Sequence, residues 1–209
     1  MSPLPVMRWL PVFAALLTPA LLLGAAPPNS DPKPDRSSLQ GQLLIASPDM
    51  SDPRFQRTVL VMIRHGADGA MGVVINRPAG EQTMARLLEV LGESSDGATG
   101  TVPIYLGGPV ELDRGLVLHS DDYRRDATRD VATGIAMTAT PEIFRDIARK
   151  AGPKKYLLAF GYAGWAPGQL ENEMMHNGWF TAPLDPKLVF DEDRGSVWDK
   201  AMQRRTRDL

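Results

Sequence analysis

Two apolar runs dominate the hydrophobic pattern of the chain, and both are typical of buried strands. Residues 58–64 (TVLVMIR) and 156–163 (YLLAFGYA) place apolar side chains on both faces of an extended segment. A strand of this kind needs a cover on each side. Residues 66–69 are typical of a hairpin turn into a further strand at 70–76. The pattern predicts a central sheet whose core contains Val59, Val61, Ile63, Val73, Ile75, Leu157, Leu158 and Phe160.

Helical periodicity and short strands alternate along the rest of the chain. Residues 83–91 repeat apolar positions at the spacing of an amphipathic helix, and residues 140–142 (TPE) are typical of a helix start. Further short strands are predicted at 103–106, 115–119, 131–138, 179–182 and 187–190, and further helices at 169–177 and 196–205. Hairpin-sized loops join several strands, and the spacing is not that of regular βαβ units. The sequence therefore predicts a single domain of mixed α/β (α+β-like) class around a mixed β-sheet.

The first 26 residues differ in character from the rest of the chain. Arg8 precedes an uncharged stretch at 9–26 that ends in small residues, as a secretory signal does before its cleavage site. The stretch is also long enough for an uncleaved membrane anchor, and a mis-assigned start of a cytosolic protein is a third alternative. Residues 27–38 contain four prolines and no large apolar residue, so we expect an extended linker there. The predicted folded domain spans 39–209.

Composition and charge exclude several classes of protein. The chain has 209 residues, 43% of them hydrophobic, so it can bury a real core, and it has no cysteine for a disulfide or a thiolate nucleophile. The first 26 residues carry only Arg8, which leaves 22 of the 23 basic residues against 25 acidic ones, a net charge of −3. This balance predicts no broad surface for direct nucleic-acid binding.

The candidate catalytic residues do not form a familiar catalytic motif. His65, His119 and His176 each stand near the end of an apolar run or a short helix, where imidazole commonly bonds to the backbone. Glu173 and His176 have the spacing of half a dimetal site, but a second Glu-x-x-His is missing. The segment nearest to a G-x-S-x-G elbow, 161–165, has alanine in the nucleophile position. The sequence therefore predicts no catalytic set, no metal and no cofactor.

A candidate binding rim is predicted from three strand ends. Asn76 and Arg77 follow one predicted strand, His119 ends another and Trp165 follows a third. If these ends lie on the same side, the side chains fall within about 15 Å of one another, the span of a small-ligand pocket. Arg77 would bind a carboxylate or phosphate and Trp165 would offer an apolar surface; the alternatives are a surface turn and a core position. The partner expected is a protein or a small anionic ligand. The full candidate set is Asn76, Arg77, His119, Trp165, Gln169 and Glu171.

Three segments resemble the YqgE/AlgH family in the same order. They are LLIASPDMSDPRFQRTVLVMIRHGADGAMGVVINRP at 43–78, YLGGPVELDRGLVLH at 105–119 and GYAGWAPGQLENEMMHNGWF at 161–180. The resemblance implies the family's single-domain fold, a mixed β-sheet that is partly barrel-like and surrounded by helices. The signature positions carried over by motif are Pro48, Asp52, Pro53, Phe55, Gly72, Asn76, Arg77, Pro78, Gly107, Gly108, Pro109, Arg114, Gly115, His119, Tyr162, Ala163, Trp165, Gln169 and Glu171.

The resemblance also implies a kind of function. The family is historically described as transcriptional regulators, so we expect a non-enzymatic binding or regulatory protein. The acidic net charge and the lack of a recognition helix in the pattern argue that any effect on transcription is indirect. The alternative is a hydrolase-like enzyme that uses His119 with Asp or Glu partners.

The signal-like residues 1–26 give a prediction about location. We expect the full-length protein to be periplasmic or associated with the inner membrane of a Gram-negative cell, whereas a cytoplasmic location, as for most of the family, is the alternative. Cell fractionation followed by N-terminal sequencing of the recovered protein measures this directly. Recovery of intact cytoplasmic protein that still begins at Met1 would contradict the expectation.

Overall fold

The computed structural model describes residues 38–206, so the predicted signal or anchor at 1–26 and nearly all of the linker lie outside the described residues. The strands are β1 (Gln42–Ala46), β2 (Val59–Gly66), β3 (Gly69–Val74), β4 (Pro78–Thr83), β5 (Thr101–Leu106), β6 (Val110–Ser120), β7 (Arg129–Ala132), β8 (Ile135–Thr138), β9 (Tyr156–Trp165) and β10 (Trp179–Pro183). The helices are α1 (Met84–Val90), α2 (Pro141–Ala148), α3 (Gln169–Met175), α4 (Pro186–Phe190) and α5 (Val197–Gln203). Among these helices, none has both the length and the apolar character that crossing a membrane requires.

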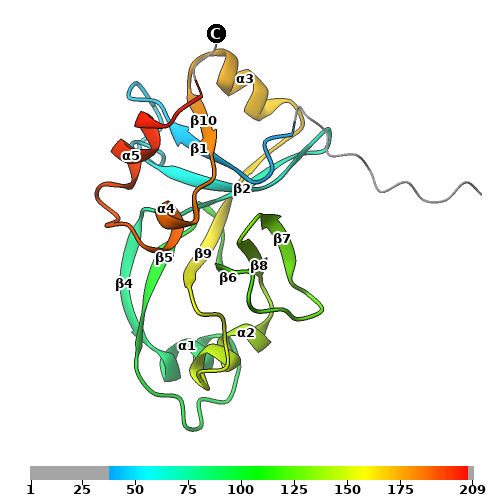
Figure 1. The fold of residues 1–209 in the computed structure, drawn as a ribbon, viewed down its shortest axis with the longest axis vertical. Helices are drawn as coiled ribbons and strands as arrows, with labels where there is room; N and C mark the ends of the chain where they lie inside the picture. The colour runs from blue at the N-terminus through cyan, green and yellow to red at the C-terminus, as the bar shows by residue number, and fades with distance from the viewer. Residues whose placement is uncertain (1–37, 207–209) are drawn as a thin grey trace, which may run out of the picture. The chain divides into compact units, whose positions relative to one another are not determined.

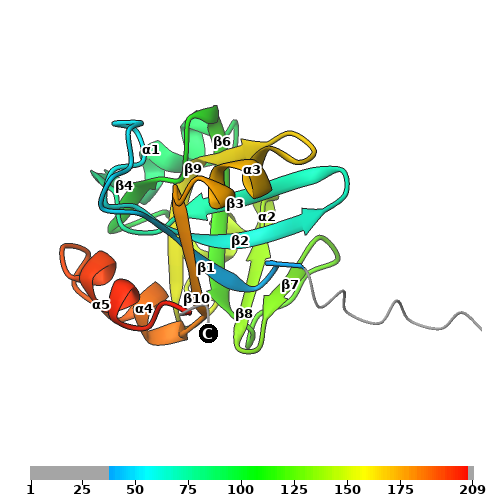
Figure 2. The same ribbon diagram turned by 90° about the horizontal axis from the view of Figure 1, so that it is seen from above.

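The strands form one curled, half-barrel sheet, with helices around it (Figures 1 and 2). The order along the sheet is β10-β1-β2-β3-β9-β6-β8-β7, and the β4–β5 pair joins it at β9. Neighbouring strands are antiparallel except β5 and β9, which run parallel. In Figure 1, α1 and α2 lie at one end of β9 and α3 lies at the other. The predicted class, a mixed α+β single domain with a partly barrel-like sheet, is confirmed.

Strand β9 pairs with different strands along its length. Its first half lies between β5 and β6, and its last residues pair with β3. The change of partner falls at Gly161, whose φ of 73° is in the left-handed region. The Gly107–Gly108 turn crosses β9 here, and a Cβ added to Gly107 would lie 2.3 Å from the Gly161 carbonyl oxygen. Glycine is needed at this crossing because a side chain would collide with the opposite backbone.

Three apolar clusters form the core within residues 38–206. The largest lies inside the curl of the sheet, where α4 and α5 contribute to it, and it includes six of the predicted core residues: Val59, Val61, Ile63, Val73, Ile75 and Leu157. Leu158 points to the other face of β9 and is buried in a second cluster with α1 and α2. Phe160 packs at the edge of that second cluster and is only partly buried, so its predicted place in the central core is wrong. The third cluster joins Leu170 of α3 to the outer face of β1–β3.

Two predicted strands have a different structure. Residues 187–190 belong to the helix α4, because Pro186 occupies its first turn and the Asp185 side chain accepts a hydrogen bond from the Lys187 amide at 2.9 Å. Residues 131–138 form a hairpin of β7 and β8 rather than one strand. The strand β4 was not predicted, because all six of its residues are exposed and give no apolar alternation.

Candidate functional site

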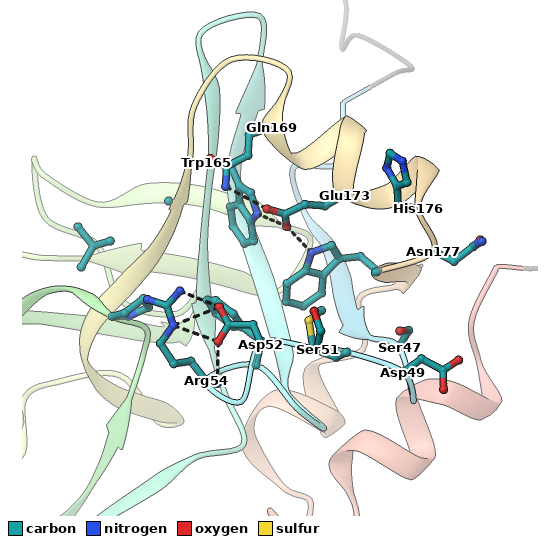
Figure 3. Close-up of a pocket in the computed structure, with 17 residues that line it drawn as sticks. Ser47, Asp49, Ser51, Asp52, Arg54, Trp165, Gln169, Glu173, His176 and Asn177 are labelled. Atoms are coloured by element: carbon teal, nitrogen blue, oxygen red, sulfur yellow. Dashed lines mark hydrogen bonds and ion pairs between the residues drawn. The ribbon is translucent and has the colours of Figure 1, made fainter.

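A pocket of about 680 Å³ opens beneath α3, on the outer face of the β1–β3 layer (Figure 3). One wall is the loop after β1, another is the start of β6, and the third runs from the end of β9 through α3 into β10. We call it the aromatic pocket. Its lining residues are Ser47, Asp49, Met50, Ser51, Asp52, Arg54, Phe55, Pro109, Val110, Gly164, Trp165, Gln169, Glu173, His176, Asn177, Gly178 and Trp179.

One carboxylate fixes the two indole rings of the pocket. Trp165 ends β9 and Trp179 begins β10, and their rings meet edge to face with centroids 5.8 Å apart. Both indole N–H groups donate to Oε2 of Glu173, at 2.9 and 2.7 Å. Its Oε1 accepts a hydrogen bond from Gln169 Nε2 at 2.9 Å. Phe55 packs against Trp179, with ring centroids 5.4 Å apart. The aromatic wall is therefore preorganised by Glu173.

The local sequence explains why Glu173 faces the indoles. Gly168 adopts the left-handed conformation, with φ of 74°, and lets the chain turn from β9 into α3. Gln169 then caps the turn, because its Oε1 accepts a hydrogen bond from the Ala166 amide at 3.1 Å. Gln169 and Glu173 are four residues apart on a helix, so their side chains share one face. That face is turned toward the end of β9.

The loop after β1 supplies the opposite wall. Asp52 and Arg54 form a bidentate pair there, with N–O distances of 3.1 and 2.7 Å. The hydrogen bond from the Arg54 side chain lowers the pKa of Asp52 below its ordinary value. Figure 3 shows this pair on one side of the pocket and Glu173 on the other. The guanidinium of Arg54 is thus already matched by a carboxylate.

Asn76 and Arg77 hold this loop in place. Asn76 accepts a hydrogen bond from the Val59 amide and donates one to the Arg57 carbonyl oxygen, both at 2.9 Å. Arg77 Nη2 donates to the carbonyl oxygen of Gln56 at 3.0 Å. These side-chain hydrogen bonds add to the backbone turns of the loop, such as the bond from the Phe55 amide to the Asp52 carbonyl oxygen at 3.0 Å. Both residues therefore position the wall of the aromatic pocket.

An apolar groove of about 230 Å³ continues from the pocket. It is lined by Arg54, Phe55, Val74, Arg77, Leu106, Gly108, Pro109 and Leu112, and the first two of these and Pro109 line the pocket as well. Leu106, Val110 and Leu112 are 40%, 37% and 57% exposed. Five large apolar side chains are exposed within residues 38–206, and three of them lie here. The pocket and the groove together form one continuous surface.

A bulge in β6 explains the exposure of Leu112. The pairing of β6 with β9 is irregular between Val110 and Gly115. Glu111 adopts a φ of 49°, and its carboxylate accepts a hydrogen bond from the Tyr162 hydroxyl at 2.9 Å. A bulge of this kind turns side chains away from the regular alternation. The side chain of Leu112 is directed to solvent beside the groove as a result.

His119 lies far from this surface. Because β6 and β9 are antiparallel, His119 pairs with Tyr156, the first residue of β9, whereas Trp165 is the last. Almost the whole of β9, on the order of 30 Å of strand, separates the two positions. The prediction that His119 shares a rim with Trp165 is wrong, because the ends of antiparallel neighbours point to opposite edges of a sheet.

A chain of hydrogen bonds surrounds the fully buried His119 side chain. Nδ1 lies 2.8 Å from the Ser120 carbonyl oxygen and so carries the proton, which leaves Nε2 to accept from the Thr138 hydroxyl at 2.9 Å. Thr138 in turn accepts from Thr128 at 2.8 Å, and Thr128 accepts from the Arg125 amide at 2.9 Å. Both ring nitrogens are therefore engaged in the neutral form, and burial lowers the pKa of His119 below its ordinary value.

Glu171 also lies outside the aromatic pocket. Its carboxylate contacts Nε2 of His65 at 2.9 Å, while Nδ1 of His65 accepts a hydrogen bond from the Leu39 amide at 3.1 Å. The pair joins α3 to the end of β2. Within residues 38–206, no group of three or more His, Cys, Asp or Glu side chains is arranged to hold a metal ion.

The structure therefore divides the predicted candidate set. Trp165 and Gln169 line the aromatic pocket, Arg77 lines the groove, and Asn76 holds the loop between them. Glu173 and Trp179, which form the centre of the pocket, were not among the predicted binding residues. The available signal was the spacing of Gln169 and Glu173 on one face of a predicted helix.

The burial of His119 predicts a specific pH dependence of stability. Its pKa is lower in the folded protein than in the unfolded chain, so the unfolded chain binds more protons as pH falls below about 6.5, and stability falls. We expect urea denaturation to show a loss of up to about 1.4 kcal/mol per pH unit below that value. His119→Gln should remove this part of the slope, and His176→Gln, at an exposed histidine, should keep it. Equal slopes in all three proteins would contradict the assignment.

Known proteins resemble this chain over most of its length. A family model described as AlgH-like matches residues 43–209. A UPF0301 protein of Afipia carboxidovorans is 49% identical over 82% of this chain and 85% of its own, and one of Ruegeria pomeroyi is 48% identical over 79% and 90%. The solution structure of the AlgH protein from Pseudomonas aeruginosa has a TM-score of 0.71 and 38% identity, and the match covers 82% of this chain and 91% of AlgH. The chain belongs to the AlgH-like family.

Proposed function

We propose that this chain is a non-enzymatic binding protein that recognises a partner protein through the aromatic pocket and the apolar groove. The observation that carries the proposal is their continuity, since Arg54, Phe55 and Pro109 line both. Large groups of exposed apolar side chains are rare on monomeric proteins and commonly mark an interaction site. Aromatic anchors within an apolar surface are typical of the core of a protein interface.

The rigidity of the surface supports binding. The indoles share one carboxylate, side-chain hydrogen bonds tie the loop to the segment that follows β3, and the start of β6 is fixed by Glu111. A preorganised surface loses little conformational entropy when a partner binds. A partner protein could therefore be held without rearrangement of the sheet.

We further propose that regulation by this protein is indirect, through the bound partner. The net charge of −3 for residues beyond the signal-like segment does not favour contact with a phosphate backbone. An exported protein would meet its partner in the periplasm or at the inner membrane. The hydrolase alternative has no support from His119, because that side chain is buried and its ring nitrogens are both engaged.

Photo-crosslinking in cells tests the proposed surface. We would place a photoreactive benzoylphenylalanine at Leu112, which is 57% exposed beside the groove, and at Val90, which is 60% exposed on α1, as a matched control. We expect a defined crosslinked product from position 112 and none from position 90. Leu106→Asp, introduced beside the first probe, should reduce the yield because a charge opposes burial of the groove. Equal products from both positions, or none from position 112, would contradict the proposal.

A further inference from the structure

We propose that the aromatic pocket binds an alkylammonium group, supplied by the side chain of a lysine in the partner protein. This inference rests on the proposed function, because it names the chemistry of the residue that the pocket would receive from the partner.

Glu173 has a carboxylate with no cationic partner among the described residues. Its three hydrogen-bond donors are the indole groups of Trp165 and Trp179 and the side-chain amide of Gln169, all of which are uncharged. None of the ion pairs within residues 38–206 includes Glu173 or Asp49. A carboxylate oxygen has more than one lone pair, so Glu173 can accept a further donor from a ligand.

The charge of the lining favours a cation over an anion. Three carboxylates, those of Asp49, Asp52 and Glu173, line the pocket beside a single guanidinium, that of Arg54. The bidentate pair with Asp52 already neutralises Arg54. Arg77, which was expected to bind an anionic ligand, directs its Nη2 donor to the Gln56 carbonyl oxygen. The carboxylates of Asp49 and Glu173 therefore line the pocket without a paired cation.

The aromatic side chains suit the methylene chain and the ammonium head of lysine. Phe55, Trp165 and Trp179 line the pocket, and a cation near an aromatic ring is attracted by the negative face of its π-system. The stem of a lysine is apolar and packs against such rings while the head remains polar. A volume of about 680 Å³ has ample room for one lysine side chain. The adjoining groove, with Leu106 and Leu112, would then receive apolar residues next to that lysine.

NMR of the indole N–H signals, in the full folded domain, tests the inference with defined probes. n-Butylammonium should shift the signals of Trp165 and Trp179 in a saturable way, and 1-butanol, its neutral isostere, should bind at least about tenfold more weakly. The peptide Ac-Leu-Lys-Leu-NH2 should bind at least about tenfold more tightly than n-butylammonium, because its leucines reach the groove. Leu112→Asp should remove that gain, and replacing the lysine by norleucine should weaken binding.

Substitutions separate a charge contact from simple filling of the pocket. Glu173→Gln keeps an oxygen for the indole donors but removes the charge, so we expect the affinity for n-butylammonium to fall at least about tenfold. Glu89→Gln, at an exposed glutamate on α1, should leave the affinity unchanged. If Glu173→Gln does not fold, Asp49→Asn in the exposed loop should still weaken binding by about threefold or more.

Several outcomes would overturn the inference. The first is equal affinity for 1-butanol and n-butylammonium. The second is the absence of a saturable shift at about 100 mM amine, a concentration well above the dissociation constant of a weak millimolar site. The third is an unchanged affinity for n-butylammonium in Glu173→Gln. Equal affinity for n-butylammonium and the lysine peptide would assign the pocket to a free amine and overturn the lysine of a partner. If the amine fails while the crosslink at position 112 forms, the binding surface stands and the lysine assignment falls.

Discussion

The arrangement of the molecule depends on the close crossing of two backbone segments at Gly107–Gly108 and Gly161. Gly107 donates its amide hydrogen to the Phe160 carbonyl oxygen, and its own carbonyl accepts from the Val74 amide, both at 2.8 Å. A Cβ at Gly108 would lie 2.1 Å from the backbone of Tyr162. The turn therefore ties β3, β5 and β9 together at the point where β9 changes partners. A side chain larger than hydrogen would force these strands apart.

This crossing also places the walls of the binding surface. Pro109 and Val110 follow the crossing directly and line the aromatic pocket, while β9 continues from Gly161 to Trp165 on the neighbouring wall. From there Gly168 turns the chain into α3, and Glu173 reaches back to both indoles. The pocket is thus a consequence of the route of β9. The proposed lysine site and the groove therefore lie on surfaces whose position is set by the sheet.

The elements that were predicted correctly are those with a clear apolar pattern or a characteristic terminal residue. The buried hairpin of β2 and β3, the strand β9 and the helix α2, which has Pro141 in its first turn, follow from apolar runs and terminal residues. The helix α4 was mistaken for a strand because a segment of five residues is too short to show a period. The exposed strand β4 has no apolar pattern at all.

The candidate site was harder to predict because it depends on strand direction. His119 and Trp165 both follow apolar strands, but the antiparallel pairing of β6 and β9 sends them to opposite edges. The motifs did identify Trp165, Gln169 and Arg77 near the pocket and the groove. Glu173 and Trp179 could not be paired from sequence, since their contact arises only when α3 folds back over β10.

Gly107→Ala tests the crossing most directly, and Gly80→Ala is its control. A Cβ at Gly80 meets nothing within 4 Å, although its φ of 117° makes alanine unfavourable there. We predict that Gly107→Ala lowers the free energy of unfolding by more than about 3 kcal/mol, well beyond the roughly 1 kcal/mol expected at Gly80. It should also speed hydrogen exchange at the Trp165 and Trp179 indole groups. Stability and exchange equal to those of Gly80→Ala would contradict the account.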